Sequence, residues 1–227
     1  MCLQEVRPST AGRFAATLSA VGLAHATDSS RFRNDRRLFN LIVSRWPCVE
    51  LPPIGAPFPE RVLSLLVETP DGPLELHNAH IPSARSRGFI KVETCEALHE
   101  QLARRSDRHR VLCGDLNLPR AETTAGGVIT FAADHPEWLE RWDAAERSII
   151  PGLAAWDLGD VFRSLHGYER QDASWVLHTG SRRKAGLRID HVLASESLRP
   201  RWCDYQHGWR EQGLSDHSGL EAIFDPA

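Results

Sequence analysis

The sequence lacks the features that mark a membrane-spanning or exported protein. Its 227 residues contain no run of about 18 apolar residues, so no transmembrane helix is expected. Residues 1–5 have neither the basic start nor the apolar core of a signal peptide. A cytoplasmic location, without a membrane partner, is therefore the expectation.

Cysteine and net charge are also scarce. The five cysteines are odd in number, widely spaced and free of any C-x-x-C pair, which argues against a zinc cage or a disulfide framework. The formal net charge is −3, so composition alone does not indicate a nucleic-acid-binding protein.

Basic residues nevertheless gather at three places that are expected to be loops. A solvated surface explains any one cluster, but three together keep a phosphate-facing role open. The clusters are Arg31, Arg33, Arg36 and Arg37; Arg85, Arg87 and Lys91; and Arg182, Arg183 and Lys184.

The spacing of apolar residues predicts one α/β domain over residues 1–227. The length suits a single domain, expected as a monomer, and no repeat or low-complexity linker interrupts it. Strand-like runs, often paired through hairpins, are interspersed with helical patterns. This predicts an α/β sandwich in which helices cover two packed sheets. Strands are expected at 38–44, 61–69, 74–80, 110–115, 188–194 and 219–224, and helices at 10–21, 92–105, 136–149 and 158–165.

Polar residues recur where these apolar runs end. Loops held by a rigid scaffold commonly carry function, so a site is expected at the strand ends. One such segment alone is weak evidence, because an isolated aspartate after glycine is usually a turn residue. The segments span 3–5, 76–80, 111–117, 187–191 and 214–217, and their candidate residues are Glu5, His80, Asp115, Asn117, Asp190, Asp216 and His217.

Three of the carboxylates suit a metal-assisted reaction. Glu5 and Asp216 offer hard oxygen ligands of the kind that Mg²⁺ or Mn²⁺ prefers. Asp115 could position or deprotonate a water molecule. These residue types are what the hydrolysis of a charged ester requires.

The remaining candidates suit the handling of phosphate. His80 and Asn117 could donate hydrogen bonds to non-bridging phosphate oxygens, and Asp190 could orient His217 through its second ring nitrogen. Cleavage of a phosphodiester needs a metal to neutralise charge, an oriented nucleophile and donors for the developing oxyanion. The set therefore indicates a divalent-metal-dependent phosphodiesterase.

The ordered motifs resemble those of the endonuclease/exonuclease/phosphatase superfamily. Residues 3–5 look like the family's L-Q-E, 114–117 its G-D-x-N, 188–191 its R-x-D-[YH] and 215–217 its S-D-H. The match extends over residues 3–224, and although each motif is short, the ordered set is specific. The resemblance implies a four-layer α/β sandwich like that of deoxyribonuclease I, with two mixed sheets flanked by helices.

The last third is most similar to the exonuclease III and apurinic-endonuclease branch. Residues 160–163 resemble its D-x-F-R, 174–175 its S-W and 186–190 its G-L-R-I-D. This implies a Mg²⁺-dependent DNA nuclease of repair type. The roles it implies are metal binding by Glu5 with support from Asp216, water handling by Asp115, phosphate contact by Asn117, and a dyad of Asp190 and His217.

Two departures keep other functions open. His80 stands where that branch usually has tyrosine, so the same fold could act on RNA or on a small phosphoester. Family members also begin with a strand that ends in asparagine before L-Q-E, whereas this sequence starts two residues before that motif. Either the start has been placed too late or the chain is truncated relative to the family, and in the second case a missing inner strand would leave unpaired backbone groups and exposed apolar surface. Low stability, weak catalysis or an inactive binding module are the expected consequences.

Overall fold

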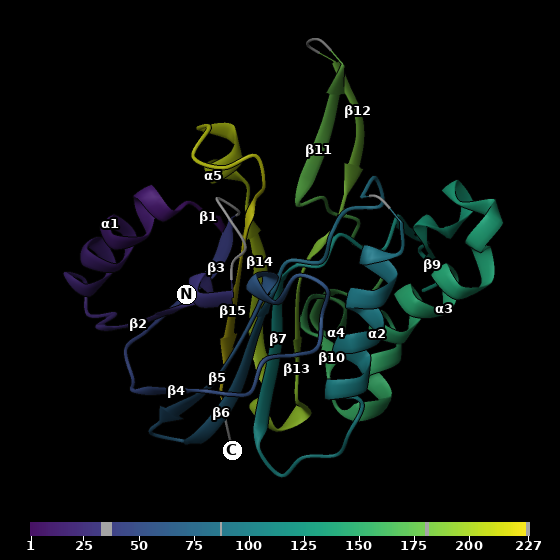
Figure 1. The fold of residues 1–227 in the computed structure, drawn as a ribbon. Coiled ribbons are helices and arrows are strands. Elements are labelled where there is room, and N and C mark those ends of the chain that lie inside the picture. Colours follow the sequence, from purple (N-terminus) through teal and green to yellow (C-terminus); the bar gives the residue numbers. More distant parts are fainter. Residues whose placement is uncertain (33–37, 87, 180–181, 226–227) are drawn as a thin grey trace.

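A mixed six-stranded sheet forms a central layer of the fold (Figure 1). Its strands lie in the order β10-β13-β7-β6-β5-β4, and only β6 and β7 run parallel. The computed structural model describes residues 1–32, 38–86, 88–179 and 182–225. The strands of this sheet are β4 Cys48–Glu50, β5 Val62–Thr69, β6 Gly72–Ala79, β7 His109–Asp115, β10 Gly159–Asp160 and β13 Asp190–Ala194.

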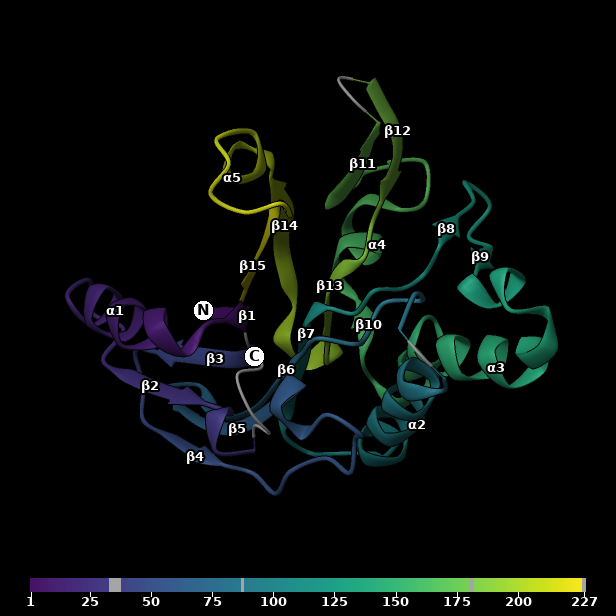
Figure 2. The ribbon, with the colours of Figure 1, turned by 45° about the horizontal axis from the view of Figure 1, so that its top comes forward.

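The second sheet layer is divided into two pieces, β1-β3-β2 and β14-β15. Within the described ranges, β1 and β15 each have a ladder partner on one side alone. Both views place these two strands near one another at the divide (Figures 1 and 2). The strands are β1 Cys2–Val6, β2 His25–Asp28, β3 Phe39–Ser44, β14 Pro200–Gln206 and β15 Gly219–Phe224.

Apolar side chains from both layers meet between the sheets. Ile42 of β3 packs with Leu63 and Leu65 of β5, and all three are buried. On the other side of the divide, Tyr205 of β14 packs in one cluster with Val111 of β7. Both pieces therefore cover the same face of the central sheet.

Helices cover the outer faces and complete four layers. Leu98 of α2 and Trp142 of α3 are fully buried in one cluster with Leu112 of β7. By contrast α1, which packs on β3, has no fully buried residue, and its Phe14 is 43% exposed. The predicted four-layer α/β sandwich is thus confirmed. The helices are α1 Pro8–Ser19, α2 Ile90–Leu102, α3 Leu139–Ile149, α4 Val161–His166 and α5 His207–Glu211.

Two further hairpins were not expected from the sequence. The strands β11 Trp175–Thr179 and β12 Arg182–Leu187 form an arm that rises from the body beside α5 (Figures 1 and 2). A short pair, β8 Ala121–Glu122 and β9 Val128–Ile129, precedes α3. Among the described residues, no helix combines the length and apolar character needed to span a bilayer.

The predicted elements agree with the structure except at some ends. The helix expected at 158–165 begins only at Val161, because the Asp160 side chain caps it by accepting a hydrogen bond of 3.1 Å from Arg163 N. The strand expected at 188–194 begins at Asp190, since Arg188 turns into a buried charge cluster.

The open edges of β1 and β15 lead to a prediction about stability. Unpaired strand edges and an outer helix without a buried residue contribute less to stability than a continuous sheet under a packed helix. We expect the purified 227-residue chain to melt below about 50 °C, at the low end for single domains. Calorimetry measures this, and a cooperative transition above that temperature would contradict it.

Candidate active site

Two aspartates meet across neighbouring strands at one end of the central sheet. Asp115 ends β7, Asp190 begins β13, and the antiparallel register pairs these two residues directly. Side chains paired in this way point to the same face, with Cβ atoms about 5 Å apart. The sheet therefore brings together two carboxylates that are 75 positions apart in the sequence.

Gly114 allows β7 to end close to β6. Its φ is +129°, and a Cβ atom at this position would lie 2.1 Å from the carbonyl oxygen of Ala79. Only glycine fits such a close approach of backbone to backbone. As a result His80, which follows β6, has Nε2 at 3.7 Å from Asp115 Oδ2.

His217 and Asp190 form a hydrogen-bonded dyad. His217 Nδ1 lies 2.7 Å from Asp190 Oδ2, and Tyr205 fixes the Asp190 backbone by donating a 2.7 Å hydrogen bond to its carbonyl. Burial disfavours the charged ring, but the hydrogen bond to Asp190 and the charges of Asp190, Asp115 and Asp216 raise the pKa of His217 to about 9. At neutral pH the dyad thus pairs an imidazolium with a carboxylate.

Asp115 is held in a position where its charge is unfavourable. Burial, and then the charge of Asp190, raise the pKa of Asp115 to about 8, against the opposite effect of His217. The Asp115 side chain is only 13% exposed. Crowded carboxylates of this kind suit a divalent cation, which would offset their repulsion.

Asn117 holds the Asp115 carboxylate from both sides. Its backbone N–H donates to Asp115 Oδ1 and its Nδ2 to Asp115 Oδ2, each at 3.0 Å, and Nδ2 also donates to the Ile81 carbonyl at 2.9 Å. A left-handed φ of +52° makes this double contact possible, and asparagine tolerates that region well. A direct contact between Asn117 and phosphate would require one of these bonds to be given up.

His80 is neutral in this environment. Burial, with the positive charges of Arg61 and His217, lowers the pKa of His80 to about 3. Arg61 Nη1 lies 3.4 Å from His80 Nε2. A neutral ring keeps a single N–H for donation to a phosphate oxygen.

Three of the predicted residues lie close together, whereas Glu5 and Asp216 lie outside this group. Ligand atoms of Asp115, Asp190 and His217 lie within 4.8 Å of one another, the spacing of a group that could share a metal ion. Glu5 sits at a left-handed φ of +55° in a strand bulge, with Oε1 3.8 Å from His80 Nε2 and its side chain 59% exposed. Asp216 is exposed and stands outside the group of three.

A cluster of buried charges lies directly before Asp190 in the chain. Arg188, two residues earlier, is 3% exposed and bonds both Glu122 and Asp160 at 2.7 Å. Burial disfavours the Asp160 carboxylate, but Arg188 and His191 hold its pKa well below the usual range. The motifs that carry Arg188 and Asp160 were visible in the sequence, whereas nothing there identified Glu122.

The residues of the three basic clusters differ in exposure and in pairing. Arg31 is paired with Glu50, Arg85 is exposed, and Lys91 is buried rather than facing solvent. Lys91 was therefore wrongly grouped with surface residues. Arg33, Arg36, Arg37 and Arg87 lie outside the described residues, as do the side chains of Arg182, Arg183 and Lys184.

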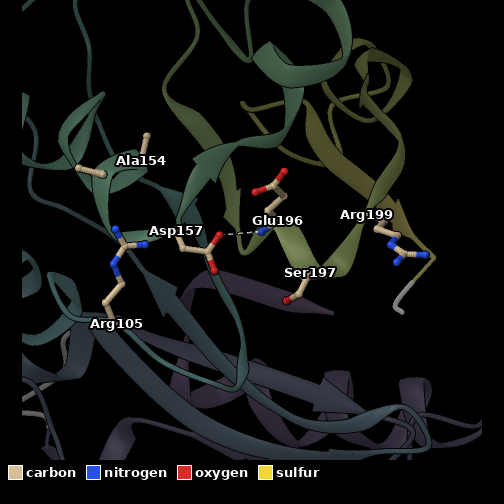
Figure 3. A pocket seen from close by; sticks show the side chains of 7 residues that line it. Arg105, Ala154, Asp157, Glu196, Ser197 and Arg199 are labelled. Carbon is tan, nitrogen blue, oxygen red and sulfur yellow. Dashed lines mark hydrogen bonds between the residues drawn. The ribbon is translucent and has the colours of Figure 1, made fainter.

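A hollow of about 660 Å³ elsewhere does not belong to this site. It is lined by residues from three segments: Arg105 after α2, Asp157 just before β10 and Glu196 after β13. Asp157 accepts a hydrogen bond from Glu196 N (Figure 3). Because β13 runs from Asp190 to Ala194, residues 196–199 lie beyond the far end of that strand.

Comparisons with known proteins agree with this geometry. The sequence model of the Endonuclease/Exonuclease/phosphatase family matches residues 1–217. Exodeoxyribonuclease III of Haemophilus influenzae is 26% identical over 184 residues, which cover 73% of this chain and 67% of that protein.

Solved structures with low identity share the fold. An AP endonuclease from Archaeoglobus fulgidus has a TM-score of 0.70 at 18% identity, with 99% of this chain and 88% of that chain covered. TDP2 of D. rerio, in a complex with a single-strand DNA product, has a TM-score of 0.62 at 13% identity, with coverage of 99% and 84%.

Proposed function

The chain belongs to the Endonuclease/Exonuclease/phosphatase family, and on that premise we propose that it is a Mg²⁺- or Mn²⁺-dependent nuclease of repair type that hydrolyses phosphodiester bonds in DNA. The observation that carries the proposal is the group of Asp115, Asp190 and His217 within 4.8 Å of one another. The sequence relative is an exodeoxyribonuclease, and one structural neighbour was solved with a DNA product, which favours DNA as the partner.

Carboxylate oxygens of the chain would bind the metal ion. Glu5 and Asp115 present carboxylate oxygens near His80, which suit a hard cation. When bound, such a cation supplies charge neutralisation at the phosphate and lowers the pKa of a coordinated water. Asp216 would contribute mainly by its charge, which helps to raise the pKa of His217.

The chain's own residues have separate tasks in this proposal. Asp115, held in place by Asn117, orients the attacking water and accepts its proton. His217, kept charged by Asp190, donates one hydrogen bond from its remaining ring N–H to the phosphate as negative charge develops. Neutral His80 offers one N–H to a non-bridging oxygen.

Two observations favour a second candidate, the same chemistry on RNA or a small phosphoester. The net charge of −3 is unusual for a protein that binds duplex DNA by its phosphates, and His80 replaces the tyrosine of the apurinic-endonuclease branch. An inactive module with the same fold is the third possibility, which metal titration would expose.

Hydrolysis assays separate these candidates. Duplex DNA with an abasic site, intact duplex, single-stranded RNA and bis-p-nitrophenyl phosphate are each incubated with the protein and Mg²⁺ or Mn²⁺. Metal-dependent nicking of DNA, with binding that weakens steeply as salt rises, is the expected result. Cleavage of RNA or the small ester alone supports the second candidate, and the absence of any turnover contradicts both.

Glu5 allows a direct test of metal dependence. Replacing Glu5 with alanine removes one oxygen donor and should raise the Mg²⁺ concentration for half-maximal activity by at least about tenfold. Glu68→Ala, which removes an exposed carboxylate from β5, is the matched control and should leave the Mg²⁺ titration unchanged. An unaltered Mg²⁺ titration curve in Glu5→Ala would contradict the role of Glu5 as a metal ligand.

A further inference from the structure

Lys91 lies inside the protein at the beginning of α2. Its side chain is 0% exposed, and its Nζ lies 2.8 Å from Glu146 Oε1 and 4.4 Å from the centre of the Phe131 ring. The same Nζ donates a 2.6 Å hydrogen bond to the carbonyl oxygen of Asn117. A buried ion pair is a poor source of net stability, because desolvation offsets most of the attraction. The contact with Asn117 therefore explains the buried Lys91 better than a gain in stability does.

Glu146 anchors the Lys91 ammonium from the side of α3. Glu146 is 1% exposed and accepts hydrogen bonds from Trp142 Nε1 at 2.7 Å and from Phe131 N at 3.0 Å. Trp142 in turn stacks on His135 with ring centres 3.9 Å apart. These contacts hold Glu146 beside the Lys91 ammonium, which reaches the loop that follows β7.

The residue Asn117 joins this buried pair to the candidate active site. Its carbonyl points to Lys91, while its N–H and its Nδ2 point to the two oxygens of Asp115. All three groups are attached to the same Cα atom, in a left-handed residue with φ at +52°. If the carbonyl lost its partner and residue 117 shifted, the donors to Asp115 would shift with it.

We infer that Lys91 is a positioning residue: by holding the Asn117 carbonyl, it keeps both Asn117 donors on Asp115. Its effect on rate rests on the proposed function, whereas its effect on Asn117 does not. Lys91 is fully buried and acts only through Asn117.

The test variant removes both charges of the pair at once. Lys91→Met combined with Glu146→Gln leaves no unpaired buried charge, so the fold is expected to survive. Glu96→Gln combined with Arg141→Met is the matched control, because it removes an exposed ion pair between the same two helices without touching the contact between Lys91 and Asn117. At a temperature at which the wild type and the double variant are both folded, kcat should fall about 100-fold in the double variant with KM nearly unchanged. A loss of this size is expected for a slight misplacement of reacting groups. The control should keep the kcat of the wild type.

Hydrogen exchange provides a readout that needs no activity. The Asn117 amide should exchange at least about tenfold faster in the double variant. The neighbouring Leu116 amide, which donates to the Ile189 carbonyl at 2.9 Å, should keep its rate and serves as the internal reference. Unchanged Asn117 exchange, or faster exchange without a loss of kcat, would overturn the inference. If the wild type hydrolyses none of the substrates, the proposed function fails, and the exchange rates still decide whether Lys91 holds Asn117.

Discussion

Asp115→Asn is expected to lower kcat by at least about a thousandfold with every phosphodiester substrate, because it removes the group that accepts the proton of the attacking water. The substitution preserves the size of the side chain. It also removes one of the crowded carboxylates beside His80, and with it part of the attraction for a cation. Single-turnover assays with Mg²⁺ at saturation separate the lost chemistry from weaker metal binding.

The same change should leave stability almost unaltered. The pKa of Asp115 is raised to about 8, so ionising this carboxyl costs the folded state free energy at higher pH, and a neutral amide avoids that cost. One hydrogen bond from Asn117 Nδ2 is lost in exchange. Asp134→Asn, the same chemical change in an exposed residue paired with Arg120, is the control for both measurements. A variant Asp115→Asn that retains more than a tenth of wild-type kcat would contradict the proposed role.

His217→Ala is expected to lower kcat by about a thousandfold as well, since it removes the charged donor aimed at the phosphate. Because Asp190 acts through His217, Asp190→Asn should cost nearly as much, and the double variant little more than either single one. His109→Ala removes a histidine at the opposite end of β7, bonded to Ser197, and should keep full activity. Additive losses in the double variant would mean that the two residues do not work as a pair.

The dyad also makes stability depend on pH. The folded-state pKa of His217 is about 9, above the value of about 6.5 in an unfolded chain. Its charged form therefore contributes stability that is complete below about pH 6.5 and is lost as the pH rises towards about 9. The difference in free energy of unfolding between wild type and His217→Ala should shrink over that interval, as urea titrations at several pH values would measure.

The part of the site at the strand ends could be predicted from the sequence, because local patterns of apolar residues show where these strands end. The apolar run before Asp115 and the short motif around Asp190 place both residues at strand ends, and the antiparallel register then pairs them. Gly114 shows why the motif needs its glycine, since any larger residue would meet the Ala79 carbonyl. The two-sheet sandwich followed from many short apolar runs joined by turns.

The parts that escaped prediction depend on distant contacts. Lys91 looked like a surface residue because Glu146, its partner, lies 55 positions later on another helix. The arm formed by β11 and β12 was missed since residues 182–187 read R-R-K-A-G-L, which lacks the alternation of a half-buried strand. The exposure of Asp216 is likewise a matter of how the loop before β15 folds, which its motif does not determine.

We propose that a hard divalent cation is held beside Asp115 at this end of the central sheet. Crystals soaked in Mn²⁺ and measured at an anomalous wavelength locate such an ion without any assay of activity. An anomalous peak is expected within about 2.5 Å of a carboxylate oxygen of Asp115 or Glu5, and it should disappear in Asp115→Asn. A peak bound elsewhere, or none at millimolar Mn²⁺, would contradict it.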